Sequence, residues 1–415
     1  MSFRRPTASF RPPTLHEPSH ADSTSTSQRP GSRDWSKTSD GQAVALSFWL
    51  VDPPGVSYFT VHCPGASVIN AEEALVPFSV TLSSAWVSRY EYFSPGPGKP
   101  SLDLLPDPGL QGFVAEEFGL LPCGDAHGGH YAVAYLNWVP IAAPRWAKYG
   151  KQNRSISFNC DDSWQFDAHL FSSETRAWTA KRASQSLSEC DKLLLGNHDH
   201  DTGKQITVGA DSLGWVNIIW GILLVTNLFD EHPVIQYIPL PEPRVRTTDE
   251  DGGIFYCADL PEYIRDVTCC DGLIKLVDVD FYGDDGGRDQ GWIATTFTRM
   301  VSWDDWRRRF TVDVAGISVD PGYRALLPDL WNDKTKQLEL KKLAYYGPTL
   351  STQDDDFVYM MARVNDEDDK ACVIAIDIKR AAVEAVAPQQ TGGSSFFLMW
   401  LLRNSIPPAL GFSVG

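Results

Sequence analysis

The sequence predicts an all-β fold of the propeller type, on three observations. The chain is rich in turn residues and in flat, stackable side chains, with 32 Gly, 28 Pro, 14 Trp, 14 Tyr and 20 Phe. Short β-prone runs separated by polar turns recur along it. Only residues 303–309 and 338–343 have a briefly helical pattern. We expect about six or seven blades of short antiparallel strands, because a closed ring leaves few exposed sheet edges.

The strands are predicted in groups, beginning near Val44. Each group consists of apolar or aromatic runs on either side of a turn rich in Gly, Pro, Asp or Ser. In the fourth group, a hydrophobic strand, a short polar turn and a tryptophan-bearing strand follow one another in a kelch-like manner. The strands expected in the first four groups are 44–49, 56–62, 78–82, 86–93, 119–122, 131–139, 164–171 and 176–179.

The most apolar hairpin of the chain spans residues 214–243. We interpret it as two buried strands hinged at 230–233 and ended by Pro239, Pro241 and Pro243, which cannot donate to a β-ladder. The last two groups have the same strand and turn pattern. Their predicted strands are 264–268, 272–279, 292–298, 310–314, 349–352, 357–364, 371–378 and 382–386.

These groups divide the chain into three parts. Residues 1–40 are rich in Arg, Pro, Ser and Thr and are predicted to be a disordered tail. Residues 41–388 form the propeller-like region, and residues 389–415 are a tail without a defined fold. The alternative fold is a pair of β-sandwich domains joined near 183–205.

The formal net charge of −17 disfavours binding to nucleic acids and to anionic membranes, which need basic surfaces. The apolar run at 396–402 is too short to span a bilayer, which takes about 20 residues. Eight cysteines without regular spacing are typical of a reducing compartment. We therefore expect a soluble, monomeric, cytoplasmic or nuclear protein, with organellar import through residues 1–40 as the alternative.

The span from about 215 to 364 resembles the plant, mostly grass, family that carries the domain DUF1618. The resemblance implies a β-propeller similar to those behind plant F-box modules. The family has no assigned biochemical function, so the resemblance supplies no catalytic or binding residues. The matching features are the segments 214–216, 220–224 and 233–241, then 265–267 and 271–275, the pair Trp303 and Trp306, and the closing segment 354–359.

One motif suggests catalysis. Gly196, Asn197, His198 and Asp199 resemble the Gly-Asn-His-Asp motif of metallophosphoesterases, and His169 lies upstream in a predicted strand together with Asp167. Such enzymes use Asp, His and Asn to hold two metal ions that clamp phosphate and activate water. The further Gly-Asp-x-x-Asp and Gly-His-x-His motifs of such a site are missing from the sequence. A solvated loop is therefore the favoured interpretation of residues 196–203.

Two further segments have weaker signals. Residues 283–289 contain the oxygen ligands of a calcium loop without EF-hand spacing, so a hairpin loop is favoured. Residues 303–309 combine two tryptophans with three arginines, which favours either a short helix anchored to the core or an interface.

No phosphate-binding loop or nucleophile elbow occurs in the sequence, so we expect no cofactor and no catalytic residues. The predicted function is a non-enzymatic scaffold that binds a protein partner of unknown identity through its loops. The alternatives are a metal-dependent hydrolase centred on His169, Asn197, His198 and Asp199, and a sugar-binding propeller.

Overall fold

The computed structural model describes the greater part of the β-rich region. Side chains are described mainly from residue 105 onward. The described backbone comprises residues 30–37, 43–49, 58–62, 66–68, 78–84, 87–95, 102–106, 117–123, 130–140, 164–188, 191, 202–243, 247–248, 254–255, 263–282, 291–352, 356–363 and 370–390. These residues form β-strands and short 3-10 helices, which confirms the all-β prediction.

Two antiparallel sheets form the N-terminal part of the fold. Both are meanders, in which each strand pairs with the next one in sequence, and β1 contacts β7. The first sheet contains β1 (Pro30–Lys37), β2 (Ala43–Trp49) and β3 (Tyr58–His62). The second contains β4 (Ala66–Val68), β5 (Phe78–Ser84), β6 (Val87–Pro95) and β7 (Leu102–Leu105).

The next two sheets meet at their first strands, where β8 contacts β13 and β14. The third sheet contains β8 (Gly119–Cys123), β9 (His130–Pro140), β10 (Trp164–Ser172) and β11 (Ala177–Arg182). The fourth contains β13 (Lys204–Gly209), β14 (Ser212–Asn217), β15 (Gly221–Thr226) and β16 (Val234–Pro239), and β12 (Ser184–Gln185) pairs in parallel with β16.

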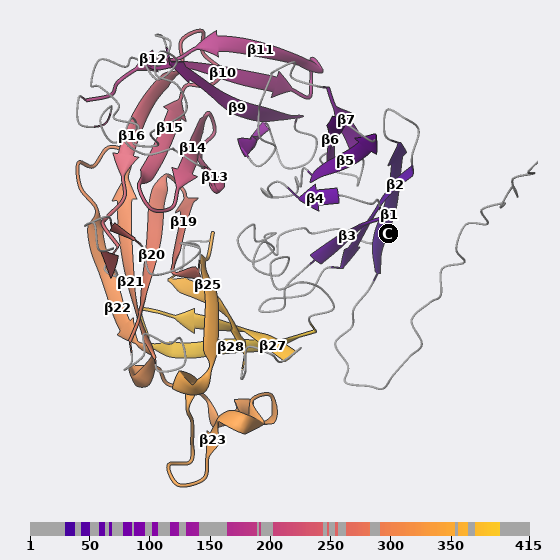
Figure 1. Ribbon diagram of the computed structural model, residues 1–415. Coiled ribbons are helices and arrows are strands. Elements are labelled where there is room, and N and C mark those ends of the chain that lie inside the picture. Colours follow the sequence, from indigo (N-terminus) through magenta and orange to yellow (C-terminus); the bar gives the residue numbers. More distant parts are fainter. Residues whose placement is uncertain are drawn as a thin grey trace, which may run out of the picture.

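The last two sheets hold the C-terminal strands. The fifth contains β19 (Arg265–Cys270), β20 (Leu273–Phe281), β21 (Trp292–Met300) and β22 (Arg307–Asp313), preceded by the short pair β17 (Thr247–Thr248) and β18 (Ile254–Phe255). The sixth contains β25 (Ala344–Leu350), β26 (Phe357–Arg363), β27 (Lys370–Asp377) and β28 (Ala382–Gln390). The six sheets follow one another in chain order around an arc (Figure 1).

Neighbouring sheets are joined by shared hydrophobic clusters. Strand β14 illustrates this arrangement, because Trp215 lies in a cluster with Phe166 of the third sheet and Val216 lies in a cluster with Val267 of the fifth. Both faces of β14 are therefore buried, as expected for a strand between two neighbouring sheets. Ala183 belongs to the same cluster as Trp215, so one core crosses the position at which the alternative fold would divide into two sandwich domains.

A buried ion pair joins three of the sheets at their first strands. Lys204 of β13 lies with its Nζ 2.9 Å from Oδ1 of Asp266 in β19. The other carboxylate oxygen of Asp266 accepts a hydrogen bond of 2.9 Å from the backbone N–H of Leu350 in β25. Only 3% of the Asp266 side chain is exposed, so breaking this pair leaves a buried charge or a buried donor without a partner.

The prediction of a single strand for the apolar run after Gly214 is wrong. The run forms two strands, β14 and β15, that turn at residues 218–220 and pair antiparallel. The Asn217 side chain accepts hydrogen bonds of 3.1 Å from the N–H groups of Ile219 and Trp220, which closes the turn. A Cβ at Gly221 would lie 2.4 Å from the Tyr237 ring, so glycine allows β16 to pack against this turn.

The expectation of a disordered tail over residues 1–40 is wrong for residues 30–37. These residues form β1, which pairs with β2 in a register that places Trp35 opposite Ala45. The polar composition of the segment does not reveal this strand, because its hydrogen-bond partners lie in the next strand along the chain. The remainder of that tail lies outside the described residues, as do residues 391–415.

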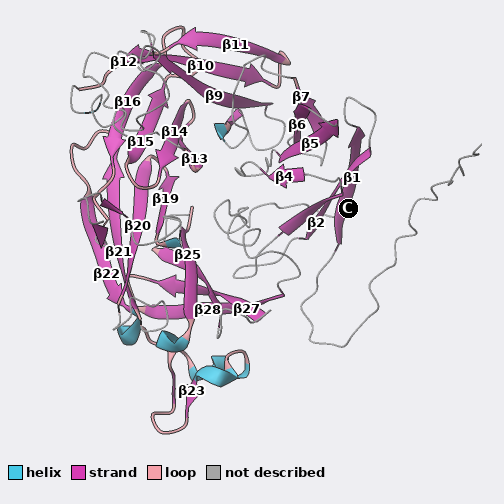
Figure 2. Cartoon of the chain, in the orientation of Figure 1, coloured by secondary structure: helices cyan, strands magenta, loops and turns pink. Residues whose placement is uncertain are grey.

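Residues 314–343 connect the fifth sheet to the sixth, and we call them the arm. The arm contains η4 (Val314–Gly316), η5 (Pro321–Ala325), η6 (Pro328–Leu330), η7 (Leu340–Lys342) and the short hairpin of β23 (Trp331–Asn332) and β24 (Gln337–Leu338). Its helical turns project beyond the sheets at the bottom of the view (Figure 2). The part of the chain that the structure describes contains no helix of the length and hydropathy that a membrane crossing requires.

Candidate interaction surface

The residues that suggested a hydrolase are only partly described. His169 lies in β10 opposite Tyr135 of β9, and its burial lowers the pKa of its imidazole, although the charge of Asp167 opposes this shift. Asp167 is engaged by the Arg182 guanidinium and by the Gln165 side chain, so it is not a free metal ligand. Asn197, His198 and Asp199 lie outside the described residues.

The described residues offer no alternative metal centre. Within them, no three His, Cys, Asp or Glu side chains lie close enough together to hold an ion. The loop 283–289, which resembles a calcium loop in its sequence, falls outside the described ranges. The alternative of a sugar-binding propeller predicts exposed tryptophans along one rim. No tryptophan with a described side chain is exposed; these are Trp178, Trp215, Trp220, Trp292, Trp303, Trp306 and Trp331.

The segment 303–309 does not form the short helix that was one of its two interpretations. It is a turn followed by the start of β22. The indole N–H of Trp306 donates a hydrogen bond of 2.8 Å to the carbonyl of Pro239, which ties this turn to the fourth sheet. The Arg307 guanidinium lies 3.9 Å from the centre of the Trp303 ring, in a cation–π contact. Trp306 is therefore structural, whereas Trp303 supports an arginine at the surface.

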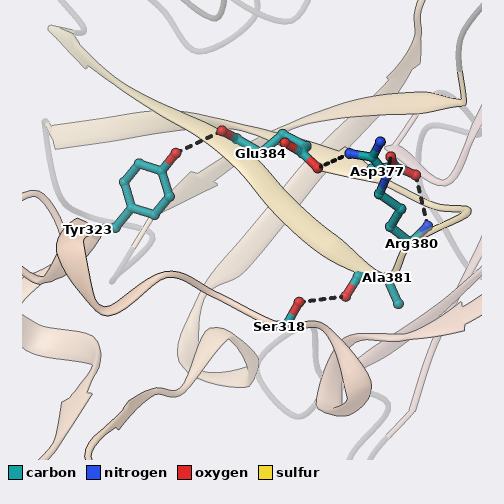
Figure 3. Close-up of polar contacts among 6 residues, drawn as sticks. All are labelled: Ser318, Tyr323, Asp377, Arg380, Ala381 and Glu384. Atoms are coloured by element: carbon teal, nitrogen blue, oxygen red, sulfur yellow. Dashed lines mark hydrogen bonds and ion pairs between the residues drawn. The ribbon is translucent and has the colours of Figure 1, made fainter.

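The base of the arm is fixed to the outer edge of the sixth sheet (Figure 3). Ser318 forms a parallel β-bridge with Ala382, and its N–H and hydroxyl donate to the Ala381 carbonyl at 2.9 and 3.2 Å. The Tyr323 hydroxyl donates a hydrogen bond of 2.7 Å to the carbonyl of Glu384. The arm thus covers the start of β28, which would otherwise be an open edge.

The turn beneath the arm is held by a chain of charges that is also visible in Figure 3. Arg380 lies 3.4 Å from Asp377 and 3.1 Å from Glu384. The Asp377 carboxylate also accepts a hydrogen bond of 2.8 Å from the Arg380 backbone N–H. Burial, together with the nearby carboxylates of Asp320 and Glu384, raises the pKa of the Tyr323 phenol, so Tyr323 stays protonated as a donor.

The inner side of the arm is part of the hydrophobic core. Leu330 is fully buried and Leu327 is 4% exposed, in one cluster with Trp292 of β21 and Tyr345 of β25. Proline at the first turn of η5 and of η6 sets the backbone dihedral that these helices need. The Asp320 carboxylate caps η5 by accepting a hydrogen bond of 2.7 Å from the Gly322 N–H.

The outer side of the arm has the features of a contact surface. Leu326 is 46% exposed, and only a few large hydrophobic residues of the described chain are exposed to this extent. The Arg324 guanidinium lies 4.5 Å from the centre of the half-buried Trp331 ring. The arm has five basic and four acidic side chains in a chain with a net charge of −17. Its exposed surface is therefore less acidic than the rest of the protein.

The tip of the arm is held in shape by local hydrogen bonds. The Asn332 side chain accepts from the N–H groups of Lys334 and Thr335 at 2.8 and 3.2 Å and donates to the Glu339 carboxylate. Hydrogen bonds from Lys342 and Asn332 lower the pKa of Glu339, so this residue remains charged. A hairpin tip that is fixed in this way holds its side chains in one arrangement.

No sequence motif marks the arm as a site. A signal was present, because prolines at 321 and 328 and a glycine at 322 interrupt the strand pattern between the predicted strands 310–314 and 349–352. The signal marked a long connection, but it could not show that this connection returns to cover β28.

Comparisons with curated proteins and with solved structures identify no informative relative. No curated protein matches the chain. Among solved structures, the WD40 domain of SCAP from fission yeast matches with 8% identity over 85% of this chain and 74% of that one, with a TM-score of 0.24. A prolyl endopeptidase structure matches with 9% identity over 79% of this chain and 49% of that one, with a TM-score of 0.22. Scores this low support no conclusion about fold or activity.

The segment matched by a family model contains both the arm and β22. It begins in β14 and ends in β26. It agrees with the span for which the sequence alone indicated a resemblance. Residues 215–359 match the family described as "Protein of unknown function (DUF1618)", and this match supports the assignment of that segment to the family.

Proposed function

We propose that this protein is a non-enzymatic scaffold of the propeller type, cytoplasmic or nuclear, that binds a protein partner through the outer surface of the arm. The observations that carry this proposal are the exposed Leu326 and the Arg324–Trp331 contact, on a segment whose base is fixed by Ser318 and Tyr323. Tryptophan, arginine and exposed apolar side chains are typical of the centres of protein interfaces. A surface that is ordered before binding loses little entropy on association.

The propeller part of the proposal rests on the order of the sheets. Six sheets contact one another in chain order, from β1 and β7 to β19 and β25, and Leu105 of β7 shares a cluster with Leu120 of β8. We propose that the ring closes between the sixth sheet and the first. Small-angle X-ray scattering tests this, because a closed disc has a more compact distance distribution than an open arc. A distribution that fits only the open arc would contradict ring closure.

The binding part of the proposal is tested by charge substitution at the arm. Leu326→Asp places a charge at the proposed contact, whereas Phe229→Asp makes the same change at a residue that is 45% exposed elsewhere. We expect partners recovered in quantitative affinity purification to fall about tenfold for Leu326→Asp, roughly 1.4 kcal/mol, and to remain unchanged for Phe229→Asp. Equal recovery with both variants, at equal thermal stability, would show that the arm is not the contact.

The absence of catalysis is also part of the proposal. A hydrolase of the phosphoesterase type would hold two transition metal ions. Elemental analysis of the purified protein therefore separates the two functions. If two tightly bound ions per chain were found, and if both were lost on His169→Ala, the scaffold proposal would fail.

A further inference from the structure

The outer edges of the sheets differ in how they are covered. The edge of β16 is paired with β12, and Ser318 of the arm pairs beside β28. The edge of β11 has no partner strand among the described residues, but its basic side chains bind other groups of the chain. Lys181 donates to the carbonyls of Leu228 and Phe229, and Arg182 is paired with Asp167.

The outer edge of β22 at residues 307–311, which we call the β22 edge, is different. β22 is the last strand of its sheet, and no described strand pairs with its outer side. Arg307, Arg308 and Arg309 are all exposed. Within the described part of the chain, none of the three has an ion pair; Arg307 and Arg309 contact the aromatic rings of Trp303 and Phe310.

Three neighbouring arginines that have no ion pair with any described residue are unexpected in this protein. The chain has 53 acidic and 36 basic residues, so most cations can find a carboxylate nearby. Arg307 and Arg308 lie opposite Thr298 and Phe297 of β21 in regular register, so their guanidinium groups lie on opposite faces of the edge, and a bulge follows before Thr311. Guanidinium groups bind carboxylates strongly, and often through two hydrogen bonds. The β22 edge therefore combines positive charge on both faces with an outer side that pairs with no described strand.

We propose that the β22 edge binds an acidic, extended segment of a partner protein as an added antiparallel or parallel strand. Backbone hydrogen bonds would supply the ladder, and the carboxylates of the added strand would meet Arg307, Arg308 and Arg309. The same arginines disfavour pairing between two copies of this chain, because like charges would then lie opposite each other. The charge of the edge therefore disfavours pairing with a second β22 and favours pairing with an acidic strand.

Contacts within the chain hold both ends of β22 in place. The turn that precedes β22 is tied to the fourth sheet through Trp306 and Pro239. Asp313, at the end of β22, caps η4 by accepting a hydrogen bond of 2.8 Å from Ala315, and it also accepts one of 2.7 Å from the Tyr282 hydroxyl. The strand is therefore held at both ends, and its position does not depend on a partner.

The test uses the full chain and a fluorescent peptide of alternating Glu and Val or Thr. A peptide with proline in place of Val has the same charge but cannot form a β-ladder. A peptide with Lys in place of Glu reverses the charge. We expect the acidic peptide to bind at least about tenfold more tightly than either of the other two, which corresponds to roughly 1.4 kcal/mol. Equal binding of the proline peptide would overturn strand addition.

Matched variants locate the site. Arg308→Glu with Arg309→Glu should weaken binding of the acidic peptide by about tenfold or more, because both charges change sign. Lys379→Glu, at an exposed position in the turn between β27 and β28, should leave binding unchanged. If Lys379→Glu weakened binding as much as the arginine variant, only the net charge would matter and the proposal would fail.

Hydrogen exchange on the wild-type protein tests the proposal without any substitution that could alter folding. Strand addition should slow amide exchange at residues 307–311 when the acidic peptide binds, because ladder formation protects amides. Binding without protection there would overturn the proposal.

A single-stranded DNA oligonucleotide tests whether the arginines bind nucleic acid instead. If it bound more tightly than the peptide and displaced it, the arginines would serve a nucleic acid, and the proposal would be wrong.

Discussion

The fifth and sixth sheets have the same meander topology but different outer edges. The sixth is covered near the start of β28 by the arm, which is anchored by Ser318 and Tyr323. The fifth is open at β22 and has three exposed arginines there. A sheet edge can therefore be protected in two ways, by pairing with another segment of the chain or by charged side chains. Only the second way leaves backbone groups available to a partner.

The largest effect on stability should come from the Lys204–Asp266 ion pair, which joins the first strands of the fourth, fifth and sixth sheets. Asp266→Ala removes the partner of both Lys204 and the Leu350 N–H. We expect a loss of about 3–5 kcal/mol in the free energy of unfolding, because a buried cation is left without its counter-ion. Urea denaturation measures this loss. The double variant Asp266→Leu with Lys204→Met should recover part of it, and failure to do so would show that the loss does not come from the unpaired Lys204 charge.

The covered edge should depend strongly on the inner side of the arm. Leu330→Ala opens a cavity at a fully buried position, with an expected cost of about 2–5 kcal/mol in unfolding free energy. Leu326→Ala, on the exposed outer side of the same segment, should cost less than about 0.5 kcal/mol. Thermal or urea unfolding of the two variants compares them directly. Similar costs would mean that the arm does not pack against the core as a structural cover.

A smaller effect is expected where the arm meets β28. Tyr323→Phe removes the hydroxyl that donates to the Glu384 carbonyl. The loss should be about 1 kcal/mol or less, since one partly exposed hydrogen bond is exchanged for water. Amide exchange at Val383, whose N–H donates to the Ser318 carbonyl at 2.9 Å, should quicken in this variant. Unchanged exchange at Val383 would show that the Tyr323 hydroxyl does not help to hold the arm against β28.

The smallest expected effect is the pH dependence of stability that comes from Tyr282, whose hydroxyl is bonded to Asp313 at the end of β22. Burial raises the pKa of Tyr282 from 10.0 to about 12, with the hydrogen bond to Asp313 and its charge as further causes. The folded state therefore favours the protonated phenol. This contribution to stability is complete below pH 10 and is lost as the pH rises through about 12. The stability difference between the wild type and Tyr282→Phe should shrink over that range. A constant difference would mean that the phenol does not titrate as described.

Local signals in the sequence predicted the strands well. Residues 273–281 and 292–300 alternate or remain apolar as strands do, and they form β20 and β21. Turn chemistry was less visible. The turn at 218–220 lies inside an apolar run, and its cause is the side chain of a single residue, Asn217. The hydrophobic pattern alone could not show that this run reverses.

The candidate surfaces were predicted only in part. The sequence pointed to Trp303 and the three arginines as an anchored helix or an interface, and the structure places the arginines at the start of an edge strand. Leu326 and Arg324 gave no signal, because exposure depends on which side of the arm faces the core. The hydrolase residues 197–199 lie outside the described part of the chain and stay a prediction.

By itself, the sequence determined the all-β class, the position of most strands and the resemblance of residues 215–364 to one family. These follow from the alternation of side chains and from turn residues, which act over a few positions. Only the tertiary structure decided which outer edges are covered, where Asp266 finds its partners and which side of the arm is exposed. Each of these depends on contacts between residues far apart in sequence, such as Ser318 with Ala381, and no local pattern encodes such contacts.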